Sequence, residues 1–167
     1  MPDDAHKPNV HVSYTLEEAA TVARNSNSER KIRVFVAEDD PAMRALLCDR
    51  LVHRGYDVAA FGDGRALLAE IDRTRLGPDG PDLVISDVRM PGVTGLQALE
   101  VMRNQFDWHV PIIMITAFGD VETHAEAYRR GATALFDKPF DVGALLRQVA
   151  ALAVPEATSR LACAVAD

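Results

Sequence analysis

The chain reads Leu-Val-Ile-Ser-Asp-Val-Arg-Met-Pro-Gly at residues 83–92. Three apolar residues in succession are typical of a strand that is covered on both faces, as strands of a parallel sheet are. Proline and glycine favour turns, and both follow within a few residues of Asp87. This stretch therefore predicts a buried strand at Leu83–Ser86, with an acidic residue at its carboxyl end.

Similar strand-length runs lie before and after it, at Ile32–Ala37, Asp57–Ala60, Ile112–Ile115 and Ala132–Phe136. Amphipathic stretches of helix length separate them, at Pro41–Arg54, Gly64–Arg73, Gly95–Gln105, Val121–Arg130 and Val142–Val154. Because crossovers between parallel strands are right-handed, such a chain forms a barrel or a doubly wound sheet, and it has too few units for a barrel of eight strands. We therefore expect an α/β, flavodoxin-like fold: a doubly wound five-stranded parallel sheet with strand order 2-1-3-4-5 and five helices.

The composition limits the class of protein. A chain of 167 residues with 48% hydrophobic residues can fill one core, so we expect one domain with short extensions. The net charge of -7 opposes nucleic-acid binding, and no apolar run approaches the roughly 20 residues of a membrane span. Cys48 and Cys163 lack metal-ligand spacing and are expected to be reduced thiols. These features predict a cytoplasmic protein with protein partners and no binding to nucleic acid or membrane by this chain itself.

The two ends of the chain differ from its centre. Residues 1–30 are polar, and Thr15 with Glu18 resembles a capping box for a short helix that runs to about Arg24. Pro155 is expected to stop the last helix. We predict an N-terminal extension at 1–30, a domain at 31–154 and a C-terminal tail at 155–167.

Acidic residues follow two of the predicted strands. The first strand ends in Glu38, Asp39 and Asp40, and the third ends in Asp87. Ligands of doubly wound sheets gather at the carboxyl ends of the strands, so we expect these carboxylates to share one crevice. Carboxylates that crowd together repel unless a cation or a proton is shared, and oxygen ligands favour Mg²⁺. Asp40, next to Pro41, is also a plausible helix cap.

A hydroxyl and an ammonium group reach the same crevice from its other side. The fourth strand ends near Thr116, and the fifth leads to Lys138. Together with a carboxylate nucleophile and a divalent metal, they complete the parts that phosphoryl transfer requires. No general base is needed, because an ionised carboxylate attacks directly.

Four segments together resemble the receiver domain of response regulators, across roughly residues 31–154. They are Val-Ala-Glu-Asp-Asp-Pro-Ala-Met-Arg (36–44), Leu-Val-Ile-Ser-Asp-Val-Arg-Met-Pro-Gly-Val-Thr-Gly (83–95), Pro-Ile-Ile-Met-Ile-Thr-Ala (111–117) and Gly-Ala-Thr-Ala-Leu-Phe-Asp-Lys-Pro-Phe (131–140). The resemblance implies a signalling protein of a two-component system or phosphorelay rather than an enzyme. Its partners would be a sensor histidine kinase or a histidine phosphotransfer protein.

The resemblance also assigns roles to single residues. It implies that Asp87 is the phosphorylated residue and that Thr116 and Lys138 contact the phosphoryl oxygens. Asp39, Asp87 and the backbone carbonyl of Arg89 would coordinate Mg²⁺, with Glu38 helping through water. The peptide bond between Lys138 and Pro139 is expected to be cis.

The chain departs from the family pattern at the expected switch position. Many members carry Tyr or Phe three residues before the lysine, whereas this chain has Leu135 there. The aromatic residue Phe136 lies one position after the expected switch position. Because neighbouring residues of a strand face opposite sides of the sheet, we expect Phe136 to face the other side. We expect Thr116 to carry the switch, with Leu135 secondary. The output surface is expected to be the face of the fourth helix, fifth strand and fifth helix, which binds a protein target or a second copy.

Three other classes of protein are the alternatives to this interpretation. A flavodoxin-like electron carrier needs a phosphate-binding loop where this chain has Glu38, Asp39 and Asp40. A phosphatase with an aspartyl-phosphate intermediate commonly has a second Asp where this chain has Arg89. The main alternative is that the receiver is a fragment of a DNA-binding transcriptional regulator.

Overall fold

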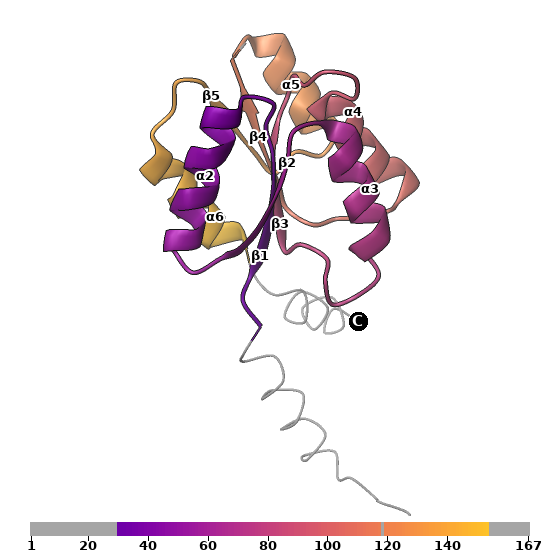
Figure 1. Cartoon of the computed structure of the whole chain (residues 1–167). Coiled ribbons are helices and arrows are strands. Elements are labelled where there is room, and N and C mark those ends of the chain that lie inside the picture. Colours follow the sequence, from indigo (N-terminus) through magenta and orange to yellow (C-terminus); the bar gives the residue numbers. More distant parts are fainter. Residues whose placement is uncertain (1–29, 118, 154–167) are drawn as a thin grey trace, which may run out of the picture. The chain divides into compact units, whose positions relative to one another are not determined.

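The computed structural model describes residues 30–117 and 119–153 (Figure 1). The predicted helix from Thr15 to Arg24, the tail at 155–167 and Phe118 lie outside the described residues. Within the described ranges, no helix combines the length and the apolar character that crossing a bilayer requires.

Five strands form one sheet: β1 (Arg33–Ala37), β2 (Asp57–Phe61), β3 (Leu83–Asp87), β4 (Ile112–Thr116) and β5 (Ala134–Asp137). Their order is β2-β1-β3-β4-β5, and every neighbouring pair is parallel, as the sequence predicts. The carboxyl ends of all the strands therefore share one edge of the sheet. Because β1 and β3 are neighbours, the acidic residues at their ends meet at this edge.

The helices are α2 (Pro41–His53), α3 (Gly64–Thr74), α4 (Gly95–Glu100), α5 (Val121–Arg129) and α6 (Val142–Leu152). Figure 1 shows α2 and α6 on one face of the sheet, with α3, α4 and α5 on the other. At the start of each of these helices, the side-chain oxygen of the preceding residue accepts a hydrogen bond from a backbone N–H of the first turn. The capping residues are Asp40, Asp63, Thr94, Asp120 and Asp141. Each of these helices thus begins at a capping residue, which ends the loop from the preceding strand.

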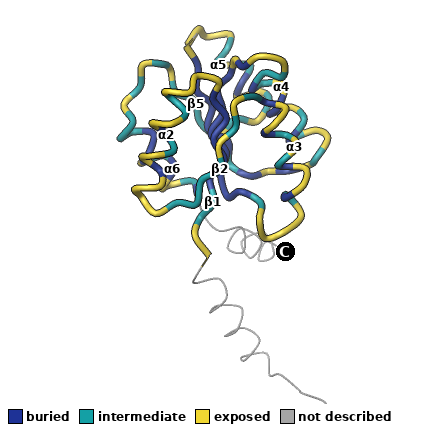
Figure 2. The backbone as a smooth tube through the Cα atoms, viewed as in Figure 1, coloured by how far each residue is buried: buried dark blue, intermediate teal, exposed yellow. Residues whose placement is uncertain are grey.

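The core consists of two apolar layers, one on each face of the sheet. Figure 2 shows the strands at the centre of the sheet as buried. Strand residues alternate between the layers: Val34 and Val36 pack in the layer that contains residues of α2 and α6, whereas Phe35 and Ala37 pack in the layer with residues of α3 and α4. All four are buried. Complete burial of a large apolar side chain contributes about 1.5–3 kcal/mol, so both layers hold the strand ends in place.

Most predicted ends lie within one or two residues of those observed, but one predicted helix differs in kind and one predicted strand differs in its start. The predicted helix at Gly95–Gln105 is α-helical only to Glu100, and a π-helical turn (Val101–Gln105) follows it. Phe106 N accordingly donates to Val101 O at 3.1 Å, and an apolar pattern this short does not separate the two kinds of turn. β5 begins at Ala134 instead of at Ala132, because the N–H of Ala132 still closes the end of α5 by donating to Ala127 O.

Candidate functional site

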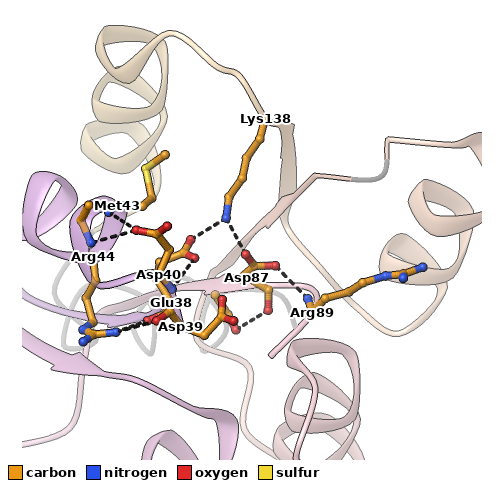
Figure 3. Close-up of polar contacts among 10 residues, drawn as sticks. Glu38, Asp39, Asp40, Met43, Arg44, Asp87, Arg89 and Lys138 are labelled. Carbon is orange, nitrogen blue, oxygen red and sulfur yellow. Dashed lines mark hydrogen bonds and ion pairs between the residues drawn. The ribbon is translucent and has the colours of Figure 1, made fainter. Parts of the chain in front are cut away.

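Three carboxylates meet where β1 and β3 end. Glu38 and Asp39 follow β1, and Asp87 is the last residue of β3. One carboxylate oxygen from each lies within 4.8 Å of the others. Glu38 and Asp87 are buried, whereas Asp39 is exposed. The structure therefore brings together three of the side chains that the sequence predicts to share one crevice (Figure 3).

Lys138, which follows β5, places its ammonium group against two of these acids. Its Nζ donates to Asp87 Oδ2 at 2.5 Å and to Glu38 Oε2 at 2.8 Å. Burial raises the pKa of Glu38, and repulsion by Asp87 adds to this, while the hydrogen bond from Lys138 opposes it. Burial alone would lower the pKa of Lys138, but its hydrogen bonds to Asp87 and Glu38 outweigh burial and raise it. Lys138 thus stays cationic and offsets the repulsion between the two acids.

The loop after Asp87 folds tightly around that residue. Arg89 N donates to Asp87 Oδ1 at 2.8 Å, and Gly95 N donates to Val88 O at 3.0 Å. A Cβ atom at Gly95 would collide with the carbonyl oxygen of Asp87, so only glycine fits there. The side chain of Arg89 is directed away from the acids in Figure 3. The loop therefore presents backbone groups to Asp87.

Thr116 and Lys138 lie on adjacent strand ends. Thr116 is buried at the end of β4, and its carbonyl accepts a hydrogen bond of 2.7 Å from Lys138 N. The peptide bond between Lys138 and Pro139 is cis, as expected. The threonine and the lysine are thus coupled through the backbone.

Asp40 caps helix α2 and is not part of the cluster of Glu38, Asp39 and Asp87. Its Oδ1 accepts from Ala42 N and Met43 N, both at 2.8 Å. The bond from Met43 N, followed by that from Ala42 N, lowers the pKa of Asp40. Its interpretation as a helix cap is confirmed.

Leu135 and Phe136 face opposite layers of the core, as predicted from their one-residue offset. Leu135 is half-buried and packs in the layer with residues of α3, α4 and α5. Phe136 packs in the other layer, where its ring lies edge-to-face with that of Phe140, and the two ring centroids are 6.0 Å apart. The ring of Phe136 therefore does not occupy the place of the aromatic side chain that many family members carry at the position of Leu135.

Two contacts around the site were not predicted. Arg44 of α2 donates to the backbone carbonyls of Glu38 and Asp39. His124 of α5 pairs with Asp137 Oδ1 at 2.8 Å, next to Lys138 in the chain. Nothing in the sequence of a helix indicates that one of its arginines contacts a loop carbonyl. A His–Asp pair between distant elements has no characteristic spacing in the sequence by which it could be predicted.

The donor set fits Mg²⁺. Glu38, Asp39 and Asp87 present only carboxylate oxygens, which hard divalent cations prefer, and their mutual spacing suits one ion. Lys138 supplies a single positive charge against these acids, so a further cation is electrostatically favourable.

Comparisons with known proteins point to one family. The response regulator receiver domain matches residues 34–150. Response regulator protein FleR of Pseudomonas aeruginosa is 39% identical over 71% of this chain and 24% of its own length. Transcriptional regulatory protein TcrA of Mycobacterium tuberculosis is 36% identical over 72% of this chain and 46% of its own. The chain thus spans about a quarter of FleR and about half of TcrA.

Solved structures give the same result. The chemotaxis response regulator CheY4 of Vibrio cholerae superposes with a TM-score of 0.66 at 31% identity, covering 74% of this chain and 99% of CheY4. Receiver domains are generally signalling modules and not enzymes, and they generally bind Mg²⁺ at an acidic site. The chain belongs to the response regulator receiver domain family of two-component systems.

Proposed function

We propose that this receiver takes up a phosphoryl group on Asp87 from the phosphohistidine of a sensor histidine kinase or a histidine phosphotransfer protein. The observation that carries the proposal is the position of Lys138 Nζ, which contacts both Asp87 and Glu38 although these acids lie at the ends of different strands. A cation beside a buried carboxylate at the carboxyl edge of the sheet suits the transfer of an anionic group.

In the proposed reaction, a carboxylate oxygen of Asp87 forms a bond to phosphorus while the bond between phosphorus and the donor's imidazole nitrogen breaks. Asp87 attacks as an anion, so no base has to remove a proton from it. Lys138 would pair with an oxygen of the phosphoryl group, and the hydroxyl of Thr116 would donate to another. The N–H of Arg89 already holds one oxygen of Asp87, which orients the carboxylate.

We assign the Mg²⁺ ligands to Glu38, Asp39, Asp87 and the backbone carbonyl of Arg89. When bound, the ion would neutralise negative charge on the transferring phosphoryl group. The three carboxylates that would hold it are those that the fold gathers within 4.8 Å.

We further propose that phosphorylation changes a protein-binding surface formed by α5, β5 and α6. These elements lie beside Thr116 and Lys138 in the chain, so they would follow any movement of those residues. On α5, residues Val121 and Tyr128 are 87% and 52% exposed, which leaves apolar area for a partner or a second copy. We expect this to occur in the cytoplasm, together with the kinase.

A second candidate function is that the receiver is the input part of a DNA-binding transcriptional regulator. The names and greater lengths of relatives such as TcrA favour it. The two candidates share the chemistry at Asp87 and differ in what the α5-β5-α6 surface contacts.

The proposed function is tested by incubating the protein with acetyl phosphate and Mg²⁺ and recording intact-protein mass spectra. We expect the parent to gain one phosphoryl group, Asp87→Asn to gain none, and the control Asp49→Asn, altered at an exposed position on α2, to match the parent. Equal labelling of Asp87→Asn and the parent would remove Asp87 from its assigned role.

A further inference from the structure

Arg44 contacts the loop of residues 38–40 from the side of helix α2. It lies in the first half of α2 and is half-buried. Its Nη1 donates to Glu38 O at 2.5 Å and to Asp39 O at 3.3 Å. In Figure 3 its guanidinium group lies on one side of the loop, and Asp87 lies on the other. Arg44 therefore touches the backbone of two proposed metal ligands without touching their carboxylates.

These bonds complete the fixation of a short loop. Glu38 N donates to Phe61 O at 3.1 Å, which joins the start of the loop to β2. The cap formed by Asp40 joins its end to α2. Arg44 holds the two carbonyls in between. A Cβ atom at Gly62 would stand 3.5 Å from Arg44 Nη1, so the loop after β2 packs against the guanidinium group from the side.

The orientation of a ligand depends on the backbone that carries it. When the carbonyls of Glu38 and Asp39 are held toward α2, the rotation of their peptide units is restricted, and so are the directions of the carboxylates. Groups that fix metal ligands from outside the coordination sphere typically alter metal affinity by about 10–100-fold. A planar guanidinium group suits this position, because it donates several hydrogen bonds and keeps its charge.

We propose that Arg44 is a positioning residue for the metal, which holds Glu38 and Asp39 so that their carboxylates converge with that of Asp87. This inference rests on the proposed function. Electrostatics alone would act in the opposite direction, because a cation near a bound Mg²⁺ repels it. Removal of Arg44 therefore weakens metal binding if Arg44 acts by positioning, and strengthens it if Arg44 acts only by its charge.

The experiment compares Arg44→Met, Arg44→Lys and the parent in Mn²⁺ titrations followed by the electron paramagnetic resonance signal of free Mn²⁺, with Mg²⁺ as competitor. Arg50→Met, at an exposed position in the last turn of α2, is the matched control. We expect Arg44→Met to weaken Mn²⁺ binding about tenfold, the lower end of the range for such residues. Arg44→Lys keeps the charge, but its side chain is one bond shorter, so most of the weakening is expected to remain. Arg50→Met should bind as the parent does.

Labelling by acetyl phosphate at increasing Mg²⁺ separates positioning from damage to the fold. For Arg44→Met we expect a higher Mg²⁺ concentration at half-maximal labelling and an unchanged plateau, because Arg44 does not contact Asp87. Unchanged or tighter Mn²⁺ binding by Arg44→Met, or parent-like binding by Arg44→Lys, would overturn the inference. A plateau that stays low at saturating Mg²⁺ would also overturn it, since Arg44 would then support the fold in general. If the parent itself neither binds Mn²⁺ nor is labelled, the proposed function fails, and this inference fails with it.

Discussion

Neighbouring acidic residues in the loop after β1 have different environments, and the backbone sets the difference. The carboxylate of Asp39 lies with those of Glu38 and Asp87, whereas that of Asp40 turns back to the N–H groups of α2. A helix cap requires a side chain at the position immediately before the first turn, which only Asp40 occupies. One residue of offset thus separates a proposed metal ligand from a structural cap.

At the residue scale we predict that Asp39→Ala loses most Mg²⁺ affinity with little change in stability, whereas Asp40→Ala loses stability and keeps most of its metal affinity. The first removes a carboxylate from the proposed ion site, and the second leaves two N–H groups at the start of α2 without their acceptor. Mn²⁺ titration and urea unfolding measure the two effects. The reverse order of metal affinities would shift the metal site by one residue.

The same cap predicts a dependence of stability on pH. Because the pKa of Asp40 is lower in the folded protein, its contribution to stability is complete above the pKa of the unfolded chain and is lost as pH falls through the folded pKa. Asp40→Asn keeps a capping side chain that does not titrate. We expect the parent to lose stability relative to Asp40→Asn as the pH is lowered into the acid range, measured by urea unfolding. Parallel pH profiles for the two proteins would contradict this account.

At the scale of elements, the ends of β4 and β5 and the start of α5 form one connected unit. Lys138 N donates to Thr116 O, and Asp137 pairs with His124 of α5. The backbone of Gly119 lies so close to the carboxylate of Asp137 that a Cβ atom there would collide with it. A shift of Thr116 is therefore resisted by contacts of β5 and α5, and a shift large enough to overcome them would move those elements.

We predict that Thr116→Ala abolishes the response of this unit to beryllofluoride bound at Asp87, and that Leu135→Ala retains most of it. Thr116 has a hydroxyl that can donate to a phosphoryl group, whereas Leu135 offers only apolar packing. Since complete burial of a leucine contributes about 1.5–3 kcal/mol and Leu135 is half-buried, Leu135→Ala should cost about 1 kcal/mol of stability. Partner binding or self-association, measured with and without beryllofluoride, gives the response. Equal loss in the two variants would make Leu135 a full switch residue.

At the scale of the whole receiver, the site exists only in the folded chain. Glu38 and Lys138 are 100 positions apart in sequence, yet Lys138 Nζ lies 2.8 Å from Glu38 Oε2. The strand order brings them together, because β3 and β4 separate β1 from β5 while all the strands end at the same edge. The long Lys138 side chain spans the remaining gap to reach both Asp87 and Glu38 (Figure 3).

The sequence predicted the sheet order and the meeting of the acids because both follow from the run of βα units and from strand-end positions. It did not predict the π-helical turn after Glu100, since its apolar pattern resembles that of an α-helix. Arg44 was missed for another reason. It acts on carbonyl groups, which every residue has, so its role becomes visible only when the loop and the helix are seen in contact.

The measurement that tests the central claim most directly is the location of the phosphoryl group. The parent protein would be phosphorylated by acetyl phosphate with Mg²⁺, reduced with borohydride to convert an acyl phosphate into an alcohol, digested, and sequenced by tandem mass spectrometry. We predict that the peptide containing Leu83–Asp87 carries homoserine in place of Asp87, and that chelation of Mg²⁺ prevents it. Homoserine at Asp39 or Asp40, or labelling that persists without Mg²⁺, would contradict the account.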